Sequence, residues 1–121
     1  MGESEKRKKI LNTLDYYFEG IFNNEVENIP LSKNVTLAGP FVPGVLEGRD
    51  AVHEFLIDVA ASFSNAQYHA EKDIIDGKDV FSLIKVRLSG GQVLDMGHLF
   101  VIKNGKIHSI QTLFDPRVML E

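Results

Sequence analysis

Two polar side chains that stand among apolar residues, Tyr17 and His98, are the residues best suited to chemistry in this sequence. A phenol can donate a hydrogen bond to a carbonyl or enolate oxygen, and an imidazole can also move a proton near neutral pH. Together they predict a pocket that polarises the oxygen of an apolar carbonyl compound. Each has a structural alternative: a core tyrosine with its hydroxyl bonded nearby, and a half-buried histidine bonded to a backbone carbonyl.

Asp115 is a third candidate, as a general base at the rim of such a pocket. It lies in the sequence Phe-Asp-Pro-Arg, and an aspartate before proline commonly ends a strand and bonds the nearby backbone or, here, Arg117. The structural role is therefore the favoured one.

The remaining histidines and the basic run near the start predict neither a metal site nor a cofactor site. The four histidines lack a close ligand spacing such as H-x-x-x-H, the chain has no cysteine, and it contains no glycine-rich nucleotide loop. The run Lys6-Arg7-Lys8-Lys9 is interpreted as the solvated first turns of a helix, although cations are unfavourable at that end of the helix dipole.

Length and charge exclude several classes of protein. The 121 residues predict one domain spanning residues 1–121. A formal net charge of −4 argues against nucleic-acid binding. No apolar run approaches the roughly 20 residues that a membrane span requires, and no apolar stretch follows the charges at the start. A cytoplasmic protein is the resulting expectation.

The pattern of apolar residues changes from helical spacing to alternation near Gln67. Before that point it predicts two amphipathic helices with a short strand between them, and after it a meander of four strands joined by tight turns. The helices must bury their apolar faces, and a curved antiparallel sheet is the available partner, so the fold class is α+β. The predicted helices are 5–24 and 49–63, and the predicted strands are 35–41, 68–75, 80–88, 93–102 and 106–114.

The turn at Gly90-Gly91 determines which side chains share a face of this sheet. A two-residue turn places Leu83 opposite His98 and Phe81 opposite Phe100. The pocket face then carries Phe81, Leu83, Met96, His98 and Phe100, and the outer face carries Ser82, Ile84, Val86, Leu99 and Val101. Because the outer face is also apolar, we expect a homodimer through it.

The last hairpin allows two registers. A two-residue Asn104-Gly105 turn puts Gln111 on the face of His98, whereas a three-residue loop puts His108 there. We prefer the three-residue loop, because it also turns inward the residues Ile110, Thr112 and Phe114.

Short motifs in the middle and at the end of the chain resemble those of nuclear transport factor 2-like (NTF2-like) proteins. The stretch from Gly48 to Phe55 is similar to their G-x-x-A-[IV]-x-x-F helix entry. The segments 104–107 and 113–117 resemble the closing hairpin and tail of SnoaL-like members. This resemblance implies a cone-shaped α+β barrel whose sheet wraps around N-terminal helices and leaves a concave pocket.

Ketosteroid isomerases are the sharpest comparison within that resemblance. Their oxyanion-hole tyrosine matches Tyr17, their protonated oxyanion-hole acid matches His98, and their general-base aspartate falls on Gly39. A standard steroid isomerase is therefore not expected.

Two hypotheses remain. The first is an isomerase, cyclase or dehydratase that acts on a small apolar carbonyl compound through Tyr17 and His98, with Asp115, water or His98 as the base. The second is a non-catalytic domain for ligand binding or dimerisation. The expected pocket walls are Phe41, Phe55, Phe63, Phe81, Leu83, Met96, Phe100, Ile110, Thr112 and Phe114.

Overall fold

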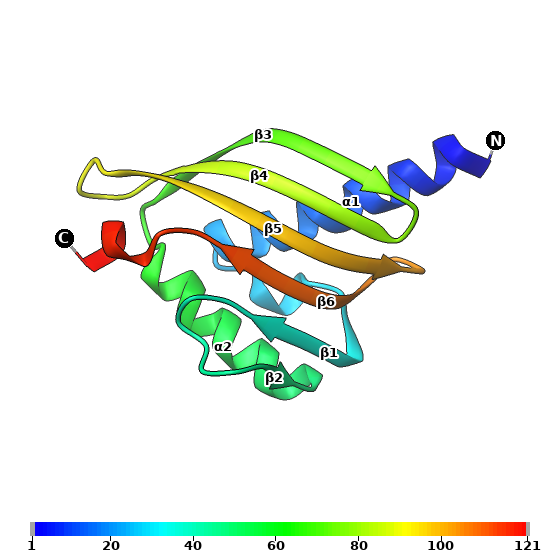
Figure 1. Cartoon of the computed structure of the whole chain (residues 1–121), viewed down its shortest axis with the longest axis horizontal. Coiled ribbons are helices and arrows are strands. Elements are labelled where there is room, and N and C mark those ends of the chain that lie inside the picture. Colours follow the sequence, from blue (N-terminus) through cyan, green and yellow to red (C-terminus); the bar gives the residue numbers. More distant parts are fainter. Residues whose placement is uncertain (1, 121) are drawn as a thin grey trace.

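The computed structural model describes residues 2–120, in which two helices cover the concave side of one curved six-stranded sheet (Figure 1). This is the predicted α+β class. The helices are α1 (Gly2–Phe22) and α2 (Arg49–Ser62), with short 3₁₀ turns η1 (Val26–Asn28) and η2 (Pro116–Leu120). The strands are β1 (Leu31–Ala38), β2 (Leu46–Glu47), β3 (Gln67–Asp76), β4 (Asp79–Arg87), β5 (Val93–Lys103) and β6 (Lys106–Leu113).

Most of these elements lie where the apolar pattern predicts them. The helix 49–63 and the four strands after residue 67 are found within a few residues, whereas the two-residue β2 was not predicted. Gly48 begins α2 with a φ of 96°, a conformation that favours glycine. Its amide donates a 2.8 Å hydrogen bond to the carbonyl of Val35, which ties the start of α2 to β1.

The sheet has the strand order β2-β1-β6-β5-β4-β3. Strands β3 to β6 form the predicted antiparallel meander, but β1 pairs with β6 in parallel, so the sheet is mixed. Because parallel strands end at the same edge, the chain after β1 lies beside the end of β6 (Figure 1). This brings Gly39 next to Thr112.

The predicted register between β4 and β5 is wrong by one residue. The loop contains Ser89, Gly90 and Gly91, and it is closed by a 2.8 Å hydrogen bond from the Leu88 amide to the Gln92 carbonyl. His98 therefore lies opposite Ser82 rather than Leu83. Since side chains alternate along a strand, this one extra loop residue inverts the whole of β4. Its buried face carries Val80, Ser82, Ile84 and Val86, and its outer face carries Phe81 and Leu83.

The hairpin between β5 and β6 begins in one of the two registers that the sequence allowed and continues with the side-chain parity of the other. Its turn is the two-residue Asn104-Gly105 type, with both residues at positive φ, 53° and 74°. The register then shifts between Val101 and Ile102, which leaves His108 as a bulge. The bulge restores the parity of the preferred prediction, so that Ile110 is buried and Gln111 is exposed.

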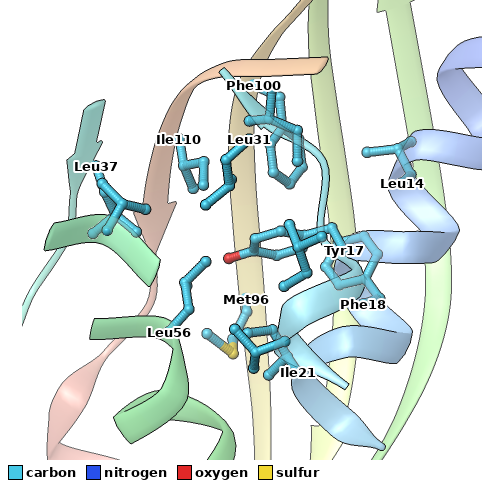
Figure 2. Packing of buried hydrophobic residues seen from close by; sticks show 14 of the residues in the cluster. Leu14, Tyr17, Phe18, Ile21, Leu31, Leu37, Leu56, Met96, Phe100 and Ile110 are labelled. Carbon is cyan, nitrogen blue, oxygen red and sulfur yellow. The ribbon is translucent and has the colours of Figure 1, made fainter. Parts of the chain in front are cut away.

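The core lies between the concave face of the sheet and the two helices. Leu14, Tyr17, Phe18 and Ile21 of α1 point toward the strands, and Leu56 of α2 approaches from the other side (Figure 2). Among the described residues, no helix has the length and apolar character needed to cross a membrane.

The register of β4 predicts unequal costs for truncating two neighbouring residues. We expect Ile84→Ala to lower the free energy of unfolding by about 3 kcal/mol, because it leaves a cavity in the core. Leu83→Ala, on the outer face, should cost less than about 1.5 kcal/mol. Urea unfolding at low protein concentration measures both values, and an equal or larger loss for Leu83→Ala would contradict the register.

Candidate functional site

A cavity of about 110 Å³ lies between the two helices and the concave face of the sheet. Its walls are mainly aliphatic and aromatic, and the polar side chains that reach it are those of Tyr17, Ser62, His98 and Thr112. The apolar lining comes from α1, β1, the loop after β1, α2, β4, β5 and the end of β6. These residues are Phe18, Ile21, Phe22, Leu37, Gly39, Pro40, Phe41, Val42, Phe55, Leu56, Val59, Phe63, Ile84, Met96 and Phe114.

Tyr17 and His98 both line this cavity. Tyr17 is buried on α1, where the helical spacing of the apolar stripe places it, and His98 is buried on β5. Their ring centroids lie 6.0 Å apart with an interplanar angle of 70°. Phe100 stacks beside His98 at 5.8 Å, and Phe18 meets it edge-on at 5.0 Å. Aromatic neighbours on two sides therefore hold the imidazole in place.

Burial lowers the pKa of His98 to about 4, because the charged imidazolium would lose its hydration in these apolar surroundings. The main chain of Ser82 partly opposes this shift. The Nδ1 atom is enclosed and has no hydrogen-bond partner within the described part of the chain. At neutral pH the ring is thus an uncharged imidazole with an unused polar atom. A buried polar atom of this kind costs about 1–3 kcal/mol, which a bound partner would recover.

The hydroxyl of Tyr17 also faces the interior of the cavity. It points away from α1 toward Leu56 of α2 (Figure 2). Burial is the one cause that raises the pKa of Tyr17 well above its ordinary value. The phenol therefore stays protonated at any physiological pH and can donate a hydrogen bond.

His98 belongs to a row of polar residues that crosses four strands. Asp73 of β3 pairs with Ser82 of β4, Ser82 with His98, and His98 with Thr112 of β6. The fully buried Ser82 hydroxyl donates a 2.5 Å hydrogen bond to Asp73 Oδ1. A bulge at Glu71 shifts the register of β3 and so gives Asp73, rather than Lys72, this inward position.

The sequence did not predict that row. Ser82 was assigned to the outer face by the incorrect hairpin register. Asp73 depends on a bulge that no turn residue marks in β3.

At Gly39, the position expected for a general-base aspartate, a side chain would require the neighbouring Thr112 hydroxyl to move. A Cβ added at Gly39 would overlap Thr112 Oγ1 on the neighbouring strand. The Thr112 hydroxyl thus lies where a Cβ at position 39 would begin, and the cavity has no carboxylate at this position.

Most of the predicted walls line the cavity, but four of them do not. Phe41, Phe55, Phe63, Met96, Thr112 and Phe114 line it together with Tyr17 and His98. Phe100 and Ile110 share the concave face but lie in the packed core beside the cavity. Phe81 and Leu83 are on the opposite face, because the loop of the β4–β5 hairpin has three residues and not two. The walls that were not predicted come chiefly from the stripes of α1 and α2.

Asp115 lies outside the cavity lining and takes the structural role. Its Oδ2 accepts a 2.7 Å hydrogen bond from Arg117 Nη2, and its Oδ1 accepts a 2.9 Å bond from Nε of the same side chain. These bonds lower the pKa of Asp115 to about 2, which makes the carboxylate a weak base. The Asp115 carboxylate is thus bound to Arg117, which is the structural role that the sequence analysis favoured.

One side of the cavity reaches the surface beside a pair of aromatic side chains. The rings of Phe41, in the loop after β1, and Phe114, after β6, lie 5.7 Å apart, and Phe41 is largely exposed. Among the described side chains, no group of three or more His, Asp or Glu residues is placed to hold a metal ion. The site therefore offers a neutral imidazole, a phenol and the Thr112 hydroxyl among apolar walls, whereas the exposed Ser62 hydroxyl donates to the Asp58 carbonyl.

Comparisons with other proteins agree with this architecture. A family model described as "Domain of unknown function (DUF4904)" matches residues 4–121. Among curated proteins none matches. Solved structures of other proteins share the fold of this chain.

An NTF2-like protein of unknown function from Cytophaga hutchinsonii is 21% identical, with a TM-score of 0.71 over 90% of this chain and 92% of its own. A candidate SnoaL-like polyketide cyclase from a Jannaschia species is 14% identical, with a TM-score of 0.76 over 93% of this chain and 90% of its own. TerC, co-crystallised with polyporic acid, is 19% identical, with a TM-score of 0.73 over 93% of this chain and 99% of its own. At these identities the likeness concerns the fold, and it confirms the NTF2-like, SnoaL-like resemblance.

The pKa of His98 predicts a specific loss of stability in mild acid. The folded protein keeps the imidazole neutral down to about pH 4, whereas the unfolded chain takes up a proton near pH 6.5. Stability is therefore complete above pH 6.5 and falls as the pH drops toward 4. Between pH 7 and pH 5 we expect the free energy of unfolding to fall by about 2 kcal/mol more in the wild type than in His98→Gln. Urea unfolding at the two pH values measures this difference, and equal slopes would show that His98 is not buried as a neutral ring.

Proposed function

The chain belongs to the DUF4904 family, and on that premise we propose that its cavity binds a compact, mostly apolar carbonyl compound. In this proposal the Tyr17 hydroxyl and the His98 imidazole hold the carbonyl oxygen, and the apolar walls enclose the rest. The observation that carries it is the unpartnered Nδ1 of His98, which lies in a mostly apolar cavity that the buried Tyr17 also lines. Ligand sites are commonly built in this way, with a few convergent polar groups in an apolar pocket.

The size of the cavity limits the ligand to something near a single ring. At about 110 Å³ it is somewhat smaller than the roughly 150 Å³ of an engineered cavity that binds benzene. A larger compound would have to displace Phe41 or Phe114, and the exposed Phe41 is the easier of the two to move.

His98 can also act as a base on such a compound. Its pKa of about 4 gives the buried imidazole nearly the basicity of an ordinary aspartate, the group that Gly39 lacks. In an isomerisation, the imidazole would take a proton from the carbon next to the carbonyl while the Tyr17 O–H donates to the enolate oxygen. The imidazolium would then return that proton to another carbon of the ligand. No external acid, base or cofactor is required.

Two of the similar structures are in keeping with a pocket for carbonyl compounds. One is a candidate polyketide cyclase and another holds polyporic acid. The alternative function is binding without turnover, and the absence of any carboxylate from the cavity lining favours it.

Removing the Tyr17 hydroxyl tests the proposed binding site. The protein would first be screened by ligand-observed NMR against small cyclic ketones and aromatic carbonyl compounds. We expect Tyr17→Phe to weaken the best ligand about tenfold, because one hydrogen bond to a buried oxygen is lost while the ring shape is kept. Tyr16→Phe is the matched control, since Tyr16 is the adjacent residue of α1 and is 55% exposed.

Equal affinity in the wild type and in Tyr17→Phe would contradict this role for the hydroxyl. The same ligand separates catalysis from binding. Uptake of deuterium from D₂O at the carbon beside the carbonyl, present in the wild type and lost in His98→Gln, would support proton transfer. Tight binding without such exchange would leave the protein as a binding module.

We also propose a homodimer through the outer face of the sheet, with residues corrected for the register of β4. Ile84 and Val86, expected there, are buried in the core instead. The outer face carries Leu99 and Val101 as expected, and it gains Ile74, Phe81, Leu83 and Leu113. Three of these, Ile74, Leu99 and Leu113, are between 43% and 50% exposed, which is a sizeable apolar surface for one face.

A charge placed in the middle of that face should separate the dimer. We expect Leu99→Glu to be monomeric by size-exclusion chromatography with light scattering, because two carboxylates would be buried at the interface. Ile57→Glu, at an equally exposed apolar position on α2, should remain dimeric. A wild-type protein that is monomeric at micromolar concentration would refute the proposed dimer.

A further inference from the structure

A second concave site lies at the end of the sheet opposite the mouth of the cavity. It is a cleft of about 950 Å³ between the first turns of α1, the β3–β4 turn and the β5–β6 turn. These three segments gather at the same end of the molecule, near the N-terminus and away from the ends of β1 and β6 (Figure 1). Its lining is Ser4, Lys6, Arg7, Lys9, Ile10, Ile75, Asp76, Gly77, Lys78, Ile102, Lys103, Asn104 and Gly105.

The cleft concentrates positive charge on an acidic protein. Among the side chains that the structure describes, five cations and one carboxylate, that of Asp76, line it, whereas the whole chain has a formal charge of −4. The ion pairs among the described side chains lie elsewhere, at His69–Glu71, Lys85–Asp95 and Arg117–Asp115. The five cations therefore repel one another across a space that a bound anion would fill.

The stability of the fold does not explain why cations occupy these positions. Lys6, Arg7 and Lys9 stand in the first turns of α1, where the positive end of the helix dipole makes cations unfavourable by a few tenths of a kcal/mol each. The fourth member of the basic run, Lys8, does not line the cleft, as the helical rotation between neighbouring residues requires. The turns contribute two more cations, Lys78 and Lys103, from parts of the sequence far from α1. Three separate segments thus place cations around one hollow.

We propose that this cleft binds a ligand that carries a cluster of phosphate groups. Several phosphates can engage several lysines and an arginine at once, and arginine can grip one phosphate with two parallel hydrogen bonds. The Ser4 hydroxyl and the polar backbone of the Asn104-Gly105 turn supply further neutral partners at the rim. The concave shape fits a discrete anionic group better than an extended strand of nucleic acid. The phosphate cluster belongs either to a free polyphosphate compound or to a lipid headgroup, and this site is independent of the one formed by Tyr17 and His98.

Two probes test the proposal on the full chain at low ionic strength. Inorganic triphosphate is titrated by calorimetry, and vesicles of phosphatidylcholine with a phosphoinositide bisphosphate are tested by co-sedimentation. We expect saturable binding that weakens steeply with added salt, because the contacts are ionic. Binding of triphosphate would identify a free phosphate compound as the ligand class, and binding confined to the vesicles would identify a lipid headgroup.

Matched double variants separate a site from general charge attraction. Lys6→Gln with Lys9→Gln removes two cations of the cleft and should weaken binding about tenfold or more. Lys8→Gln with Lys33→Gln changes the net charge equally at two exposed positions outside the cleft and should weaken it less than about twofold. Amide NMR shifts on adding triphosphate should map to Ser4, Lys78 and Gly105. No binding of either probe, or equal losses in the two double variants, would overturn the proposal.

Discussion

The alternation of side chains across a β-strand is the constraint on which both the core and the cavity depend. Because the period is two, a single extra residue in a loop or strand exchanges the buried and exposed faces of everything that follows. This chain uses three such residues: one in the Ser89-Gly90-Gly91 loop, one at the Glu71 bulge and one at the His108 bulge. Together they bring Asp73, Ser82, His98 and Thr112 into one row across four strands. Without the bulge in β3, a lysine would face the buried Ser82 in place of a carboxylate.

The buried polar groups of Tyr17 and His98 lower the stability of the folded protein, and the packing of the core does not require them. An enclosed Nδ1 without a partner and a phenol held among apolar side chains both destabilise the folded protein relative to apolar residues of similar size. Aromatic contacts from Phe18 and Phe100 orient the His98 ring, but they do not satisfy its nitrogen. Proteins commonly retain such locally unfavourable groups where a ligand or a reaction uses them. These unfavourable buried polar groups, more than the fold, distinguish the cavity from ordinary core.

The elements and the two central residues could be predicted from sequence because each rests on a strong periodic signal. Tyr17 follows from the helical stripe of α1, and His98 from its parity with Met96 and Phe100 along β5 together with the family resemblance. The face of β4 could not be predicted, since Phe81 and Leu83 are as apolar as Ile84 and Val86, so hydrophobicity does not choose between the registers. Gly90-Gly91 fits loops of two or three residues equally well. Asp73 and the parallel pairing of β1 depend on a bulge and on tertiary contacts, which leave no mark on the local sequence.

A net charge of −4 conceals a division of the molecule into an apolar end and a basic end. Helix α1 contributes to both: Lys9 lines the basic cleft, and Tyr17 lies two turns further along, about 12 Å away at 1.5 Å per residue. Between them the interior is filled by buried side chains, Ile10 and Leu14 on the helix and Phe100 and Ile102 on the sheet. No ligand can pass through that layer without unpacking it, so the two sites can be occupied separately. Two elements connect the sites. A shift of α1 along its axis would move Tyr17 against His98 and the cations against the two turns together, and β5 carries both His98 and Lys103.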